Sequence, residues 1–289
     1  MNALAFGEVL WDVYPEERCL GGATMNFAAH FKKCGGKAWI VTSVGEDLLG
    51  KEAVDRILKL GIETEYVTYS KNKETGKCLI TLDKNKIPSY ELLNNVAYDE
   101  IKKPKLVDKI FDVLYFGTLA LRNENNLSVL KQIISENKFN DFFVDVNLRP
   151  PYYSKDVIRF ALENATVVKI SDEELPAVMN ALGKKYKIKE ECAQILSKDF
   201  DNLKIILITK GDKGSFAYDT ENKKIFESQP PKVDVASTVG AGDSFFAAFV
   251  TQYLKTKDIP TALSLATNLS AFVVSCKDAI PEYELSDFE

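Results

Sequence analysis

Short apolar runs alternate with helix-like segments along most of this chain, and that alternation limits the possible folds more than any other feature. Six strand-like runs stand out, at residues 3–9, 39–44, 113–116, 142–146, 167–170 and 205–209. Most have a helical pattern before or after them. Such runs are typical of strands covered on both faces, as in a parallel sheet built from βαβ units. The pattern therefore predicts an α/β fold, and no linker divides the 289 residues into separate domains.

One region breaks this rhythm. Residues 76–93 contain two strand-like segments, 77–82 and 89–93, joined by a turn-rich stretch at 83–88. This pattern predicts a β-hairpin. A hairpin does not easily join a parallel sheet, so we expect it to project. The pattern alone leaves two interpretations open, a lid or dimer contact and an edge hairpin without a function.

Overall charge and cysteine use exclude several classes of partner. The net charge is −5 and the pI is near 5.3, which argues against nucleic-acid and anionic-membrane partners. The five cysteines form no C-x-x-C pair, so reduced thiols in a cytoplasmic protein are expected. The first residues resemble a strand rather than a signal peptide, and no apolar run reaches the length of a membrane span.

The sharpest candidate site is the segment Thr238-Val-Gly-Ala-Gly-Asp-Ser-Phe245, which opens a long apolar helix. Free amides in a first helical turn attract anions, so Gly240, Ala241 and Gly242 form a candidate anion hole. Asp243 in the same turn is a candidate base for a hydroxyl proton. A helix start with a capping acid explains the pattern equally well, but the apolar helix behind it would give a catalytic group rigid support.

A second candidate lies near the N-terminus. Gly21-Gly22 leads into a helix whose first turns carry Asn26, an amide suited to a polyol. We expect Asp12 at the carboxyl end of the first strand, where ligands bind in open α/β sheets. Taken alone, the segment also fits an ordinary βα turn.

Three further segments follow predicted strands. Alternation along an extended chain would place Asp145, Asn147 and Arg149 on one side, with Arg149 able to hold a phosphate, although a surface turn is also possible. Glu174 begins a helix, and either caps it or holds a hydrated Mg²⁺. The glycine turn after Thr209 could border a nucleotide, but strand–turn–strand is the simpler interpretation.

Two partial motifs are rejected. Residues 45–52 nearly match a P-loop, but Glu52 replaces the Ser or Thr that would hold Mg²⁺. The pair Gly240 and Gly242 does not extend to G-x-G-x-x-G, because Phe245 occupies the sixth position. A dinucleotide site is therefore not predicted.

Taken together, the Gly-Gly-x-x-x-Asn segment ending at Asn26, the late Gly-Ala-Gly-Asp segment ending at Asp243 and the chain length resemble the PfkB (ribokinase-like) family of carbohydrate kinases. Residues 7–12, 21–26 and 145–149 look most similar to bacterial fructokinases. The resemblance implies a single kinase domain over residues 1–289. Its expected fold is a three-layer α/β/α sandwich with a mostly parallel central sheet and a small β lid, whose strands come from about 13–20 and 76–93.

The resemblance also implies roles for individual residues. Asp243 would be the base, and Gly240, Ala241 and Gly242 the anion hole. Asp12, Gly22, Asn26 and Arg149 would bind the substrate, with Arg149 near the phosphates. Thr209, Gly211, Gly214 and Asn268 would lie near the nucleotide, and Glu174 would hold Mg²⁺ through water.

The implied activity is ATP-dependent phosphorylation of D-fructose to fructose 6-phosphate. Alternatives are 2-keto-3-deoxygluconate or ribose as the substrate, or a catalytically impaired protein that binds a sugar or a nucleotide. Two positions depart from the family pattern: Ser237 replaces an aspartate, which argues against the family's K⁺ site, and Ser171 replaces an asparagine. A homodimer through the lid is a further candidate assembly.

Overall fold

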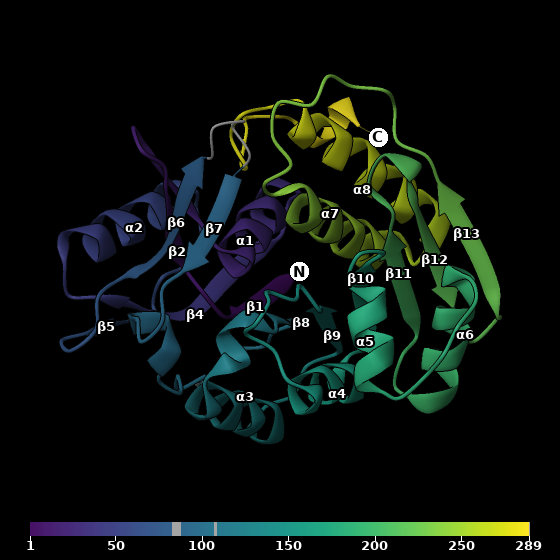
Figure 1. Ribbon diagram of the computed structural model, residues 1–289, viewed down its shortest axis with the longest axis horizontal. Helices are drawn as coiled ribbons and strands as arrows, with labels where there is room; N and C mark the ends of the chain where they lie inside the picture. The colour runs from purple at the N-terminus through teal and green to yellow at the C-terminus, as the bar shows by residue number, and fades with distance from the viewer. Residues whose placement is uncertain (83–87, 107–108, 289) are drawn as a thin grey trace.

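The structure is a computed structural model that describes residues 1–82, 88–106 and 109–288. Its largest feature is a nine-stranded sheet in the order β13-β12-β11-β10-β9-β8-β1-β4-β5 (Figure 1). The strands are β1 (Asn2–Phe6), β4 (Lys37–Gly45), β5 (Val67–Ser70), β8 (Val113–Gly117), β9 (Asp141–Asp145), β10 (Val167–Ser171), β11 (Ile205–Thr209), β12 (Ser215–Asp219) and β13 (Lys224–Ser228). From β5 to β11 neighbouring strands are parallel, and β12 and β13 are antiparallel.

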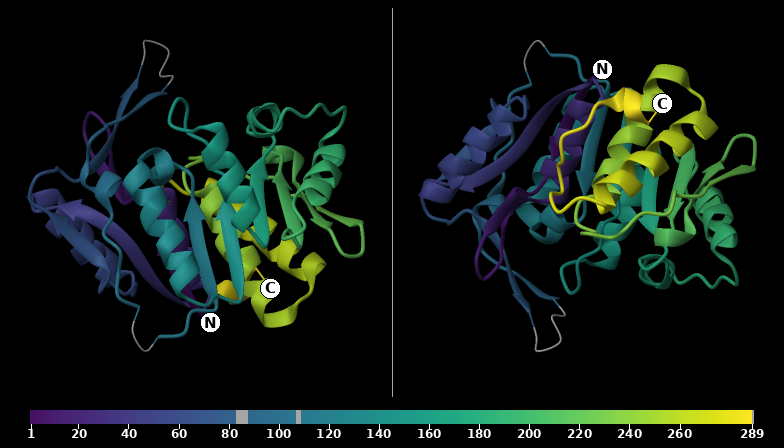
Figure 2. Two further views of the ribbon diagram at one scale, coloured as in Figure 1. Left: turned by 90° about the horizontal axis from the view of Figure 1, so that it is seen from below. Right: turned by 90° about the horizontal axis from the view of Figure 1, so that it is seen from above.

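Helices cover both faces of this sheet. One side carries α1 (Ala23–Lys33), α2 (Leu48–Lys59), α7 (Ala241–Thr256) and α8 (Ile259–Val274). The other side carries α3 (Glu124–Glu136), α4 (Lys155–Asn164), α5 (Leu175–Ala181) and α6 (Lys189–Asp199), and Figure 2 shows both layers. Ala3 and Ala5 of β1 pack into the first core, whereas Leu4 and Phe6 pack into the second. A strand buried on both faces reads as a continuous apolar run, which explains the sequence pattern.

A second sheet of four strands, in the order β3-β2-β6-β7, lies beside α1 and α2 and extends away from the body (Figures 1 and 2). Its strands are β2 (Leu10–Val13), β3 (Arg18–Gly21), β6 (Gly76–Leu82) and β7 (Pro88–Leu92). Leu10, Cys78, Ile80, Val96 and Tyr98 form a small core of its own. The predicted hairpin is therefore present as the antiparallel pair β6 and β7. Its expected turn at 83–87 lies outside the described residues.

The fold class predicted from the sequence is confirmed, and the four helices predicted at 23–34, 48–60, 240–254 and 259–276 are present with ends within two residues. The first predicted strand is wrong. Residues 3–9 do not form one strand, because β1 ends at Phe6 and the chain turns at Gly7 into the second sheet. Gly7 has a φ of +155°, and a Cβ there would lie 2.2 Å from Thr24 Oγ1, so the turn requires glycine.

As a result Asp12 does not stand at the carboxyl end of a main-sheet strand, where the sequence analysis placed it. It lies within β2, paired with Cys19 of β3 and Cys78 of β6. Asp12 therefore moves with the second sheet rather than with the body.

No helix in the described ranges combines the length and apolarity needed to cross a bilayer.

Candidate active site

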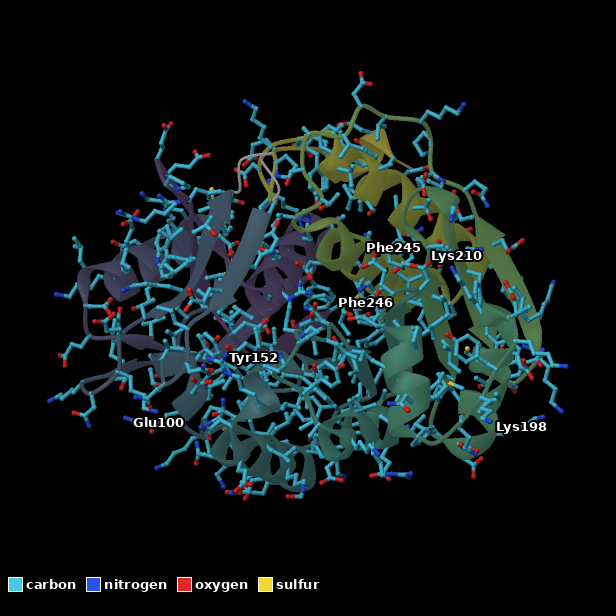
Figure 3. All side chains as sticks on the ribbon, in the orientation of Figure 1. Glu100, Tyr152, Lys198, Lys210, Phe245 and Phe246 are labelled. Atoms are coloured by element: carbon cyan, nitrogen blue, oxygen red, sulfur yellow. The ribbon has the colours of Figure 1, made fainter. Side chains whose placement is uncertain are left out.

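The start of α7 is built to leave its first amides available. Gly240 precedes the helix with a left-handed φ of +80°, and a Cβ there would lie 2.7 Å from the carbonyl oxygen of Ala279. Only glycine fits this position without displacing backbone. Behind it, Phe246 packs against the rings of Tyr115 and Phe143, with centroids 6.1 and 6.0 Å apart, and Figure 3 labels Phe245 and Phe246 on this first part of α7. The helix tip is thus rigidly held, with amides that have no acceptor inside the helix.

Asp243 lies in this first turn and is 9% exposed. Its Oδ2 accepts a 2.8 Å hydrogen bond from Nδ2 of Asn26, on α1. The other amide atom of Asn26, Oδ1, is buried and has no partner within the described residues. Burial raises the pKa of Asp243, while the Asn26 bond and the charges of Lys169 and Arg149 partly offset this rise. The structure thus joins two predicted site residues that lie 217 positions apart.

Lys169 is a site residue that the sequence analysis missed. Its Nζ donates to both carboxylate oxygens of Asp145, at 2.9 and 2.8 Å, and both side chains are buried. The ammonium also borders the helix tip, since a Cβ on Gly242 would lie 3.1 Å from Nζ. Burial raises the pKa of Asp145 to about 6 despite the opposing charge of Lys169. Burial alone would lower the pKa of Lys169, but Asp145 and Glu174 more than offset this and leave it raised.

Arg149 lies among three carboxylates. Its charge lowers the pKa values of Glu8, Asp12 and Asp243, although burial is the larger effect and leaves all three raised, that of Asp12 to about 6. The predicted alternation from Asp145 to Arg149 is wrong. Asn147 has a φ of +40°, so the chain is not extended, and Asp145 is buried while Arg149 is exposed.

Gly22 shapes the start of α1. It has a φ of +103°, and a Cβ there would lie 2.7 Å from the carbonyl oxygen of Glu8. The buried carboxylate of Glu8 accepts from the amide of Ala23 at 3.1 Å and so caps the helix. This cap fixes the turn that carries Asn26 toward Asp243.

A groove of about 1080 Å³ leads from the start of α7 across the carboxyl ends of β10 and β11. Its volume suits a nucleotide. It is lined by Lys169, Ser171, Thr209, Gly211, Gly214, Thr238, Ala241 and Gly242, by the segment 230–235, and by Thr267, Ser270, Ala271 and Val274 of α8, among others. The structure thus gathers Thr209, Gly211 and Gly214 beside the helix tip. Asn268 is not among the lining residues.

Glu174 links two loops. Its Oε1 accepts from the amide of Leu148 at 2.6 Å and its Oε2 from that of Ser171 at 2.7 Å. Both oxygens are thus used by the backbone, so a water-mediated contact to Mg²⁺ stays a prediction. In the described ranges no three His, Cys, Asp or Glu side chains cluster as metal ligands. This suits Mg²⁺ held mainly by nucleotide phosphates, the usual arrangement for that ion.

The pfkB family carbohydrate kinase model matches residues 13–284. Probable fructokinase-5 of Arabidopsis thaliana is 26% identical, covering 96% of this chain and 93% of the relative. The 5-dehydro-2-deoxygluconokinase of Clostridium botulinum is 28% identical, covering 94% and 84%. A double mutant of Vibrio cholerae fructokinase, solved with fructose, ADP and potassium ion, aligns with a TM-score of 0.85 and 21% identity over 99% of this chain and 97% of that one.

Proposed function

Because this chain belongs to the pfkB family of carbohydrate kinases, we propose that it transfers the γ-phosphoryl group of ATP to a sugar hydroxyl at the start of α7. One observation carries this proposal. A buried carboxylate, Asp243, an ammonium, Lys169, and the amides that follow Gly240 converge at one end of a nucleotide-sized groove. These are the base, the positive charge and the anion hole that phosphoryl transfer requires.

In the proposed reaction the sugar hydroxyl oxygen forms a bond to the γ-phosphorus while the bond to the bridging β–γ oxygen breaks. Asp243 takes the hydroxyl proton, and ADP leaves with the bridging oxygen. The amides of residues 240–242 and Lys169 bind the charge that gathers on the transferred group. Positioning and charge neutralisation account for most of the rate of such reactions.

For the acceptor we propose D-fructose, giving fructose 6-phosphate, with Asp12, Gly22 and Asn26 in contact with the sugar. The orphaned Oδ1 of Asn26 supports this, since a sugar hydroxyl would give it a donor. The fructokinase names of several relatives support it too. The Clostridium relative named for a sugar acid keeps 2-keto-3-deoxygluconate as the alternative, together with ribose and a catalytically impaired binding protein.

When bound, Mg²⁺ would supply further positive charge on the phosphates, with Glu174 as the nearest proposed contact through water. K⁺ is left out of the proposal. Ser237 has no carboxylate, and its Oγ accepts a 3.2 Å bond from the amide of Val239, which occupies it within its own turn. A homodimer through the second sheet and a cytoplasmic location stay predictions.

A coupled assay of ADP release with a panel of sugars tests this function. The panel contains D-fructose, ribose, 2-keto-3-deoxygluconate and 5-dehydro-2-deoxygluconate, each with ATP and Mg²⁺. We expect the highest kcat/KM with fructose. A preference for a sugar acid would refute fructose but not the kinase, whereas no ADP release with any sugar would refute the proposed reaction.

The pH dependence should reflect the environment of Asp243. A base must be ionised to act, and burial raises the pKa of Asp243 above its ordinary value of 3.8. We therefore expect kcat/KM to fall as pH decreases through this raised pKa, with the acid limb above pH 3.8. In Asn26→Leu the limb should move to higher pH, because the lost hydrogen bond favoured the charged form. A limb that does not move in this variant would contradict the assignment of Asp243 as the titrating base.

A further inference from the structure

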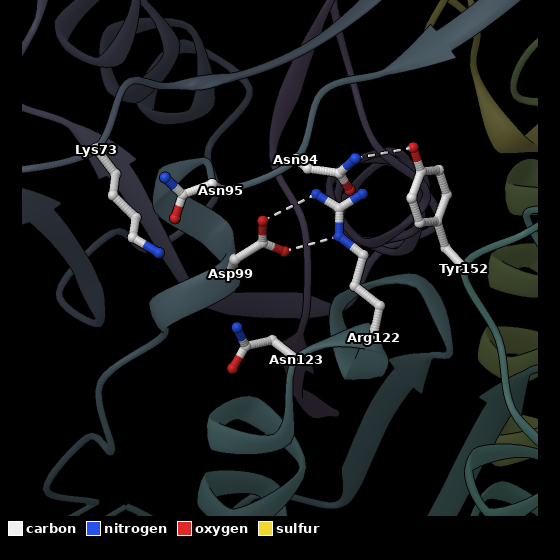
Figure 4. A pocket seen from close by; sticks show the side chains of 7 residues that line it. All are labelled: Lys73, Asn94, Asn95, Asp99, Arg122, Asn123 and Tyr152. Atoms are coloured by element: carbon white, nitrogen blue, oxygen red, sulfur yellow. Dashed lines mark hydrogen bonds and ion pairs between the residues drawn. The ribbon is translucent and has the colours of Figure 1, made fainter.

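Two residues of the body hold the end of β7, the last strand of the second sheet. The hydroxyl of Tyr152 donates to the carbonyl oxygen of Leu92 at 3.0 Å, and Nη2 of Arg122 donates to that of Leu93 at 2.7 Å. Asn94 Nδ2 donates to the same tyrosine hydroxyl at 3.3 Å. Figure 4 shows Arg122 and Tyr152 facing each other beneath Asn94. Two consecutive carbonyls of the sheet are therefore tied to side chains from outside it.

Arg122 is fixed in place. Asp99 accepts from its Nε at 2.8 Å and from its Nη2 at 2.9 Å, and the two side chains are 7% and 5% exposed. The guanidinium carbon also lies 5.0 Å from the ring centre of Tyr98 and 4.8 Å from that of Tyr152. A planar guanidinium paired at two points and set between two rings has little freedom to turn.

The same groups line a small pocket of about 270 Å³ together with Lys73, Asn95 and Asn123 (Figure 4). On this side the end of β7 does not pack closely against the body. Directed hydrogen bonds rather than close packing therefore fix its position here.

This network connects two parts of the candidate active site. The sheet that ends in β7 also contains β2, which carries Asp12. On the body side, Tyr152 follows Arg149 by three residues, and its amide donates to the carbonyl oxygen of Arg149 at 2.6 Å. A shift of the sheet would therefore pull on the turn that sets the position of Arg149.

We propose that Tyr152 and Arg122 are positioning residues that couple the placement of the second sheet over the sugar to the placement of Arg149. Neither touches the substrate. The inference rests on the proposed function, because it takes Asp12 and Arg149 as substrate-binding residues.

A double-mutant cycle between Tyr152→Phe and Arg149→Met tests the coupling, using the sugar with the highest kcat/KM. The phenylalanine keeps the ring and loses only the hydroxyl. We expect Tyr152→Phe to raise KM for the sugar about 2- to 10-fold, the usual effect of one lost hydrogen bond, and to leave KM for ATP unchanged. In the Arg149→Met background the same change should have no further effect, because its action passes through Arg149.

Two more variants complete the test. Tyr153→Phe alters the neighbouring tyrosine, which takes no part in this network, and should behave as the wild type. Arg122→Lys keeps a charge for Asp99 but cannot hold Asp99 and Leu93 in the same fork, so it should reproduce the effect on the sugar KM. The proposal fails if Tyr152→Phe and Arg149→Met act additively, if both KM values rise together, or if Tyr153→Phe has the same effect.

Hydrogen exchange separates failure of the coupling from failure of the proposed function, since it needs no turnover. In Tyr152→Phe we expect faster exchange both at residues 88–93 and at the Tyr152 amide. Unchanged exchange at the Tyr152 amide would refute the coupling. A wild-type protein that releases no ADP would refute the kinase proposal and leave this result to stand by itself.

Discussion

Asp243→Asn is expected to lower kcat about 10²- to 10⁴-fold, the usual contribution of a positioned general base. Asparagine has nearly the same shape and can still accept the hydrogen bond from Asn26, but it cannot take a proton from a hydroxyl. KM for the sugar should change little, because the contacts to the ground state remain. Initial rates of ADP release at saturating sugar and ATP provide the measurement.

A stability measurement serves as the control for this variant. Burial raises the pKa of Asp243, so the ionised carboxylate is costly in the folded state. The neutral asparagine should therefore leave Tm unchanged or higher. A loss of kcat accompanied by a large drop in Tm would point to misfolding, and full turnover in a folded variant would refute the role of Asp243 as base.

The second large effect is expected at Lys169. Lys169→Met removes the ammonium that borders Gly242, and kcat should fall about 10²- to 10³-fold, the range found when one preorganised donor to a transition state is lost. The substitution also leaves Asp145 buried without its partner. Breaking a buried pair in this way typically costs about 3–5 kcal/mol of stability, so the single variant will also melt earlier.

The double variant Lys169→Met with Asp145→Asn separates these two effects. A neutral amide at 145 removes the uncompensated charge, so most of the lost Tm should return. The rate should not return, because the positive charge at the helix tip is still missing. If kcat recovers together with Tm, Lys169 has only a structural role.

The fold could be read from the sequence because each level of the pattern agreed. Strands buried on both faces, such as β8 and β11, are continuous apolar runs, and long buried helices such as α7 are apolar nearly all round. The segments that end at Asn26 and Asp243 were also correctly singled out, since each combines glycine at a special backbone angle with a polar side chain one turn later.

Tertiary contacts explain what the sequence analysis missed. Nothing local indicates that the chain leaves the main sheet at Gly7, because the clash that demands glycine there involves Thr24, 17 positions away. That departure carries Asp12 into the second sheet. The role of Lys169 depends on Asp145 in the neighbouring strand. One local signal was available, since a lysine inside the apolar run Val167-Val-Lys-Ile170 is rarely buried without a partner.

Glu174 illustrates the opposite case. The capping interpretation accounts for its contacts in this structure, because both carboxylate oxygens accept backbone amides. Sequence alone could not choose between a cap and a metal contact, since both place an acid at the start of a helix. The pairing with Leu148, from the neighbouring loop, is visible only in the folded chain.

A crystal structure of the wild-type protein with a non-hydrolysable ATP analogue, Mg²⁺ and the best sugar of the panel tests the central claim most directly. The account predicts γ-phosphate oxygens about 3 Å from the amides of residues 240–242 and from Lys169 Nζ, with the acceptor hydroxyl in hydrogen-bond contact with Asp243. A terminal phosphate bound elsewhere in the groove, or a sugar hydroxyl out of reach of Asp243, would contradict it.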